Sequence, residues 1–100
     1  MIYALVVGGT KEAVEVRLLE WHAGPGRVLA PGDLIVELET HKVIVEVRAQ
    51  QSGVLRRIMC RPGEWRKLGE VLAILSDEPD TPLPASADGL PMWEASFSIA

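Results

Sequence analysis

Apolar and polar residues alternate over most of the first three quarters of the chain. Alternation with a period of two places one set of side chains on a buried face and the other in solvent, and it predicts β-strands. No stretch has a convincing helical period. The alternating or short apolar runs that predict strands are 2–7, 14–18, 34–39, 43–48, 54–59 and 71–75. We therefore expect an all-β domain.

A repeat at an offset of 37 residues relates two halves of this region. Glycine at the repeated turns would allow backbone angles that other residues resist. Two equivalent halves favour two small antiparallel sheets, related by a pseudo-twofold axis and packed as a flattened β-barrel or sandwich. The equivalent turn residues are Pro25-Gly26 with Pro62-Gly63, and Gly32-Asp33 with Gly69-Glu70.

A predicted hairpin joins the two halves. Its arms are Leu34–Glu39 and Val43–Arg48, and the three residues between them are a normal hairpin loop length. Lys42, one of three lysines in the chain, therefore stands at a solvent-exposed tip. An exposed lysine is protonated at neutral pH and lacks the desolvation that activates a catalytic lysine. We expect Lys42 to be either a plain surface charge or a substrate of another enzyme, and we predict no catalytic residue.

The strand pattern ends near Ser76. Residues 77–100 contain four of the seven prolines and carry a net charge of -5, whereas residues 1–76 sum to +1. We expect residues 1–76 to form the domain and residues 77–100 to form a flexible linker or tail rich in proline, alanine and acidic residues. The final nine residues turn apolar again, and the sequence leaves open a frayed terminus, a docking peptide or the start of a further domain.

Composition excludes several classes of function. Nothing here has the clustered basic residues of a nucleic-acid-binding surface. No apolar run approaches the roughly 20 residues of a membrane span, and the N-terminus lacks the charged flank of a signal peptide. A single cysteine, Cys60, excludes an internal disulfide framework. His22, His41 and Cys60 lack the spacing of metal ligands. We expect a cytoplasmic protein without a metal site, and no nucleic-acid or membrane partner.

The hairpin tip has the sequence Glu39-Thr40-His41-Lys42-Val43. This motif resembles the Glu-Thr-Asp-Lys-Ala or Glu-Thr-Asp-Lys-Val signature of lipoyl-attachment (biotinyl/lipoyl) domains, as in the acyltransferase components of 2-oxo acid dehydrogenase complexes. The resemblance covers about residues 2–76. It extends to the Pro-Gly turns and to further matching pairs before and after the motif, which are Gly32-Asp33 and Gly53-Val54.

The resemblance implies a carrier domain with no catalysis of its own. A lipoate ligase or lipoyl transferase would join lipoic acid to the Lys42 amine as an amide. The implied partners in the complex are a thiamine-diphosphate-dependent decarboxylase, which acylates the lipoyl arm, and dihydrolipoamide dehydrogenase, which reoxidises it. Glu39, Thr40, His41 and Val43 would be the residues that the modifying enzyme recognises. His41 departs from the aspartate that is usual in the family.

Two alternatives stay open from the sequence. A biotin carrier domain has the same fold and the same lysine position, although methionines typically flank its lysine where this chain has His41 and Val43. An unmodified adaptor would use the fold for protein binding and would leave Lys42 solvated.

Overall fold

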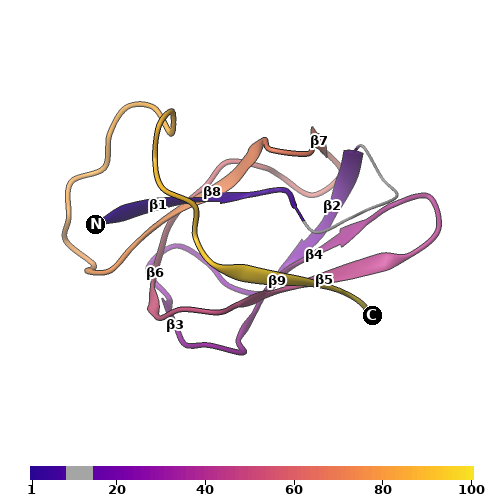
Figure 1. The fold of residues 1–100 in the computed structure, drawn as a ribbon, viewed down its shortest axis with the longest axis horizontal. Coiled ribbons are helices and arrows are strands. Elements are labelled where there is room, and N and C mark those ends of the chain that lie inside the picture. Colours follow the sequence, from indigo (N-terminus) through magenta and orange to yellow (C-terminus); the bar gives the residue numbers. More distant parts are fainter. Residues whose placement is uncertain (9–14) are drawn as a thin grey trace.

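The computed structural model describes residues 1–8 and 15–100, which form nine strands and no helix (Figure 1). The all-β prediction is confirmed. Val14, at the start of one predicted strand, lies outside the described residues. No helix able to cross a membrane occurs in the described ranges. The strands are β1 (Ile2–Val6), β2 (Glu15–Trp21), β3 (Val28–Leu29), β4 (Leu34–Glu39), β5 (Ile44–Ala49), β6 (Gly53–Ile58), β7 (Trp65–Lys67), β8 (Val71–Ser76) and β9 (Ala95–Ile99).

The strands form two antiparallel sheets, in the orders β1-β8-β6-β3 and β7-β2-β4-β5-β9. Both sheets contribute alternate side chains to one core, as the period-two pattern predicts. Leu5 and Leu55 from the first sheet, with Leu18 and Leu38 from the second, are at most 1% exposed. Because aliphatic side chains fill the space between the layers, burial of apolar surface is the main force that holds the two sheets together.

The 37-residue repeat appears in the hydrogen bonds of the structure. The Gly26 N–H donates to the Leu55 carbonyl at 2.7 Å, and the Gly63 N–H donates to the Leu18 carbonyl at 2.8 Å. Each half therefore binds a turn of the other half in the same way. All four repeat glycines have φ between +86° and +95°, a conformation that disfavours a side chain, and they are Gly26, Gly32, Gly63 and Gly69.

The pseudo-twofold relation also explains where the hairpin lies. Pairing of β4 with β5 corresponds to pairing of β8 with β1. A short turn joins β4 to β5, whereas β1 begins the described chain and β8 continues into residues 77–90. Met1 and Asp77 meet there, with the terminal amine 3.5 Å from the Asp77 carboxylate. The molecule thus has the β4–β5 hairpin at one end and Met1 at the other (Figure 1).

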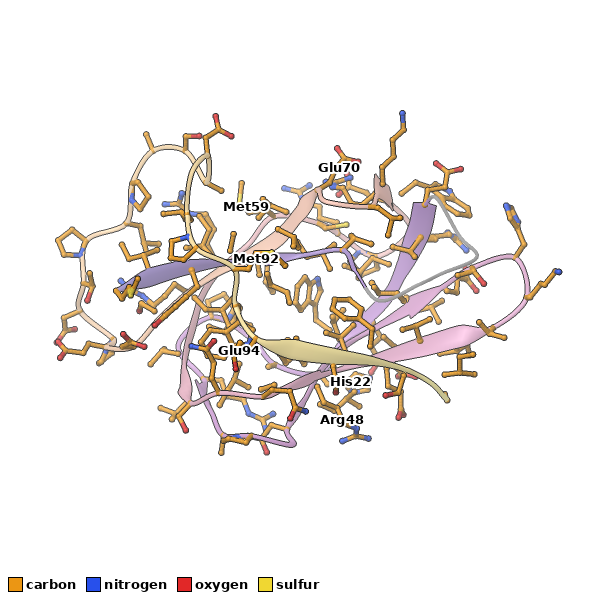
Figure 2. The ribbon with its side chains drawn as sticks, viewed as in Figure 1. His22, Arg48, Met59, Glu70, Met92 and Glu94 are labelled. Atoms are coloured by element: carbon orange, nitrogen blue, oxygen red, sulfur yellow. The ribbon has the colours of Figure 1, made fainter. Side chains whose placement is uncertain are left out.

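The C-terminal segment differs from the sequence-based expectation of a flexible linker or tail over 77–100. Residues 77–90 contain neither strand nor helix. Residues 91–99, in contrast, pair with strands of both sheets. The Trp93 N–H donates to the Ala4 carbonyl on β1 at 2.9 Å. The chain then crosses to the second sheet, where β9 pairs with β5 from Ala49↔Ala95 to Val45↔Ile99. Figure 2 labels Met92 and Glu94 on either side of this crossing.

Trp93 explains why this segment is ordered against the domain. Its side chain is 3% exposed, belongs to the core and meets Tyr3 edge-to-face with 5.6 Å between ring centroids. The ring occupies space that only a glycine leaves free, because a Cβ on Gly53 would lie 2.7 Å from it. A composition rich in proline and acidic residues predicted an unpacked tail. The burial of Trp93 and the pairing of β9 with the edge of β5 instead hold residues 91–99 against the domain.

Candidate functional site

The tip of the β4–β5 hairpin holds all five residues of the sequence-predicted site. β5 begins at Ile44, one residue later than expected, so the turn is 40–43. The Thr40 N–H donates to the Val43 carbonyl at 2.9 Å and closes the turn. Thr40 Oγ1 accepts hydrogen bonds from the N–H groups of Lys42 and Val43, each at 3.2 Å. One threonine side chain therefore fixes the backbone on both sides of the lysine.

Lys42 is exposed at this tip, and its amino group has no hydrogen-bond or ion-pair partner among the described residues. The neighbouring Val43 is half-buried and packs against the core. Beyond it, Val45 and Val47 are at most 3% exposed and anchor β5. A free amine thus stands on a turn whose flanking strand is held by buried side chains.

Glu39 is paired with an arginine and is not a free solvated acid. Arg17 Nη1 lies 2.8 Å from Glu39 Oε1, and Arg17 stands directly opposite Glu39 in the β2–β4 register. Both side chains are partly exposed, so the pair contributes little to stability, but it does neutralise the carboxylate next to the tip. Sequence reasoning missed Arg17, because only the register between two strands brings it to Glu39.

His41 turns back onto the sheet and contacts Trp65 on β7. The ring centroids are 5.7 Å apart and the ring planes differ by 34°. Trp65 is 42% exposed, so its ring lies on the surface and not in the core. No local motif connects positions 41 and 65, and the sequence alone offered no signal for this contact.

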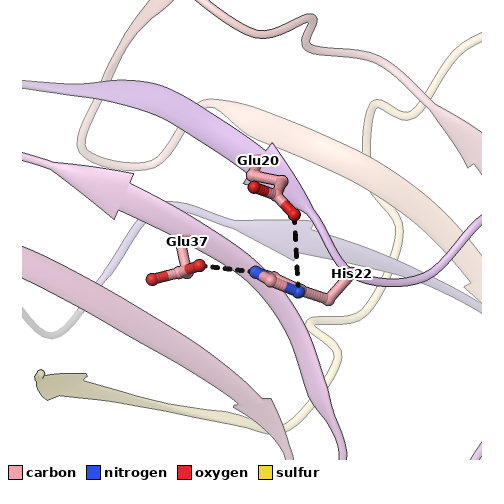
Figure 3. A group of neighbouring side chains, drawn as sticks. All are labelled: Glu20, His22 and Glu37. Carbon is pink, nitrogen blue, oxygen red and sulfur yellow. Dashed lines mark hydrogen bonds and ion pairs between the residues drawn. The ribbon is translucent and has the colours of Figure 1, made fainter.

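A second group of polar side chains is formed by Glu20 on β2, His22 just after that strand, and Glu37 on β4 (Figure 3). Glu37 Oε1 is 2.5 Å from His22 Nε2, and Glu20 Oε2 is 3.8 Å from His22 Nδ1. The two carboxylates therefore approach opposite nitrogens of one imidazole, as in Figure 3. A metal ion takes only one nitrogen of a histidine, so this geometry fits a ring held between two carboxylates better than a metal centre.

Cys60 offers no reactive group to the site. Its side chain is 1% exposed, and burial raises the pKa of the thiol. A thiolate is the nucleophilic form of cysteine, and burial of this kind disfavours it.

Comparison with known proteins agrees with this geometry. Residues 7–75 match the biotin/lipoyl family model described as "Biotin-requiring enzyme". Among curated proteins, the chain is 35% identical over 63 residues to the dihydrolipoyllysine-residue succinyltransferase component of the 2-oxoglutarate dehydrogenase complex of Bacillus subtilis, a match that covers 63% of this chain and 15% of that protein. The component of the same name from Cupriavidus necator is 32% identical over 69 residues, which is 69% of this chain and 17% of that protein.

A further relative serves a different complex. The dihydrolipoyllysine-residue acetyltransferase component of the pyruvate dehydrogenase complex of Neurospora crassa is 37% identical over 59 residues, covering 58% of this chain and 13% of that protein. The chain thus matches less than a fifth of the length of each of these relatives. The match to the family model, over residues 7–75, includes the whole hairpin and both Pro-Gly turns. The resemblance expected from the sequence is therefore confirmed, and the chain belongs to the biotinyl/lipoyl-attachment family, as in the acyltransferase components of 2-oxo acid dehydrogenase complexes.

Proposed function

We propose that this chain is a lipoyl carrier in which lipoic acid is joined to Lys42 by an amide bond. The observation that carries the proposal is an exposed lysine amine at the tip of a hydrogen-bonded hairpin, within the Glu39–Val43 motif. Nothing among the described residues caps that amine, so an acyl group can be added without displacing a neighbour. The amide would remove the positive charge of the side chain, and the dithiolane would supply acyl-carrying and thiol–disulfide redox chemistry.

The residues of the domain would present this arm and take no catalytic part. Thr40 Oγ1 holds the N–H groups of Lys42 and Val43, and the buried valines of β5 keep the tip fixed to the sandwich. Tethering to a fixed point raises the effective concentration of a carried group to the order of millimolar for short flexible links. Such a domain would transfer acyl groups and electrons between active sites that belong to other proteins.

The partners in this proposal follow from the same chemistry. A lipoate ligase or lipoyl transferase would load Lys42 and would contact Glu39, Thr40, His41 and Val43. A thiamine-diphosphate-dependent decarboxylase and dihydrolipoamide dehydrogenase would then act on the loaded arm. The names of the relatives, which place them in 2-oxoglutarate and pyruvate dehydrogenase complexes, support this set of partners.

Intact mass measurement tests the proposal. We expect the protein to gain the mass of one lipoyl amide after incubation with lipoate ligase, ATP and lipoic acid. Lys42→Arg should abolish the gain, and Lys67→Arg, which changes another exposed lysine, should leave it intact.

The same measurement separates the alternatives. A biotin-sized gain with biotin protein ligase, and none with lipoate ligase, would make the chain a biotin carrier. The family description "Biotin-requiring enzyme" is the observation that favours this second function. No gain with either ligase would contradict covalent loading of Lys42 and would favour the unmodified adaptor.

A further inference from the structure

Trp65 is an exposed aromatic residue at a position where the equivalent strand of the other half has none. The repeat relates Trp65 on β7 to Val28 on β3, and both lie opposite the equivalent residue of a longer strand, Arg17 and Val54 respectively. Val28 fills its place in the sheet with a small β-branched side chain that is 72% exposed. The pseudo-twofold relation therefore supplies an internal control: strand pairing at this position needs no aromatic residue. Only the copy on the second sheet, which also carries the hairpin, has a tryptophan.

The position of Trp65 leads directly to the hairpin. Trp65 lies opposite Arg17, Arg17 opposite Glu39, and Glu39 opposite Ile44, so the four residues form one row across β7, β2, β4 and β5. Directly opposed residues share a face of the sheet. Arg17 alternates with the buried Val16 and Leu18, so the row faces outward. On this outward face, the row is the one next to the turn that holds Lys42.

His41 reaches across this row. β4 and β7 are separated by β2, which places them two strand spacings apart, about 10 Å. The imidazole and the Trp65 ring, with centroids 5.7 Å apart, therefore meet on the outward side of this sheet, between the hairpin tip and β7. Arg17 itself is held by Glu39 and by the Gly63 carbonyl, to which Arg17 Nε donates at 3.4 Å. The side chains on the Trp65 side of Lys42 thus form one connected layer.

We propose that His41 and Trp65 are a positioning pair that sets the orientation of the hairpin tip and thereby determines how efficiently the modifying enzyme recognises Lys42. This inference rests on the proposed lipoylation of Lys42. An aromatic contact on one side of a protruding turn restricts the directions in which the turn can tilt. The modifying enzyme then meets a tip that is already oriented, and orientation of the reacting group is a direct contribution to rate.

A double-mutant cycle tests the pair. Four forms of the full chain are compared for lipoylation by lipoate ligase: wild type, Trp65→Val, His41→Asp and the double variant. Valine copies the side chain of the equivalent position 28, so strand pairing is retained. We expect Trp65→Val to lower kcat/KM by about threefold to tenfold in the His41 background, the scale of one aromatic pair. In the His41→Asp background, where no ring contact exists, the same substitution should change kcat/KM by less than about twofold.

Two controls separate positioning from folding. Val28→Ala removes an exposed apolar side chain from the equivalent strand of the other sheet and should leave kcat/KM unchanged. In NMR spectra, the ring protons of His41 should carry a ring-current shift from Trp65 and should lose that shift in Trp65→Val. A thermal midpoint for Trp65→Val close to that of the wild type would show that the domain itself is intact.

The outcomes distinguish this inference from the proposed function. If the wild type is lipoylated and Trp65→Val has equal effects in both backgrounds, or none, then the pair does not position the tip and the inference is wrong. If no form is lipoylated, the proposed function fails, and the inference that depends on it fails too. In that case the NMR shift reports whether the ring contact exists without any role in loading.

Discussion

Thr40 is the residue on which the geometry of the tip depends most directly. Its hydroxyl oxygen accepts two backbone hydrogen bonds, and its own N–H closes the turn. The motif predicted that Thr40 belongs to the recognition site but did not say how it acts. The structure assigns it an internal role, because its hydrogen bonds are to the turn itself.

Thr40→Val should therefore loosen the turn without changing its volume. We expect a loss of about 1 kcal/mol in the free energy of unfolding, since each lost hydrogen bond is modest at an exposed site. The rate of ligase-catalysed loading of Lys42 should fall as well. Urea denaturation and intact mass measure the two effects, and Thr40→Ser, which keeps the hydroxyl, is the matched control. Full loading rates for Thr40→Val would show that the hydroxyl does not organise the tip.

The buried thiol of Cys60 makes the stability of the domain depend on pH. Because burial raises the pKa of its thiol, the folded state holds the proton more tightly than the unfolded state. The resulting contribution to stability is complete below the pKa of an unfolded thiol, about 8.5, and is lost as the pH rises through the folded pKa.

We expect the free energy of unfolding of the wild type to fall more steeply with alkaline pH than that of Cys60→Ala. Urea denaturation between about pH 8 and pH 10, compared between the two forms, measures the difference in slope. Iodoacetamide should modify Cys60 slowly in the native protein and rapidly in urea. Parallel stability profiles for the two forms would contradict a buried, protonated thiol.

At the scale of elements, β9 changes the boundary of the folded unit. The family match ends at residue 75, yet residues 91–99 lie against the edges of both β1 and β5. An open strand edge can pair with other chains, and here β9 covers the edge of β5. Sequence patterning left open whether the apolar end is a frayed terminus, a docking peptide or the start of a further domain, because five residues of strand and one anchor are a short signal next to a run rich in proline.

Trp93 should hold this element in place. We expect Trp93→Ala to cost about 3–5 kcal/mol in the free energy of unfolding, as for other buried aromatic residues. Trp93→Phe should cost clearly less, because it keeps an aromatic ring and removes an indole N–H that has no partner among the described residues. Met92→Ala is the control, since Met92 is 66% exposed beside it. Denaturant unfolding measures the stability of all three variants. Equal stability of Trp93→Ala and Met92→Ala would show that Trp93 does not anchor residues 91–99.

The whole molecule is organised by its pseudo-twofold relation. Equivalent glycines, equivalent turns and reciprocal hydrogen bonds join the two halves, and the difference between them lies at their ends. One end has a turn, which carries Lys42, and the other has Met1 beside Asp77. The two ends thus differ in how the chain continues: β4 turns directly into β5, whereas β8 leads into residues 77–90.

Matched substitutions of Gly26 and Gly63 test whether the two Pro-Gly turns are energetically equivalent. Gly26 and Gly63 have φ of +94° and +90°, and an alanine at such angles costs roughly 1–2 kcal/mol. We expect Gly26→Ala and Gly63→Ala to lower the free energy of unfolding by similar amounts. Denaturant unfolding of both variants tests this, with Gly24→Ala as the control, because Gly24 has open space around it and no positive φ. Costs that differ by more than about 1 kcal/mol would contradict equivalent turns.

The sequence by itself determined six of the nine described strands, the repeat, the hairpin and the position of Lys42. These features rest on local patterns: a period of two, a glycine at each of the repeated turns and a short hairpin loop are all encoded within a few residues. Only the tertiary structure decided which side chains surround the lysine. Arg17 reaches Glu39, and Trp65 reaches His41, through the register and order of strands far apart in the chain. Strand register depends on how two complete sheets pack, and no local pattern contains that information.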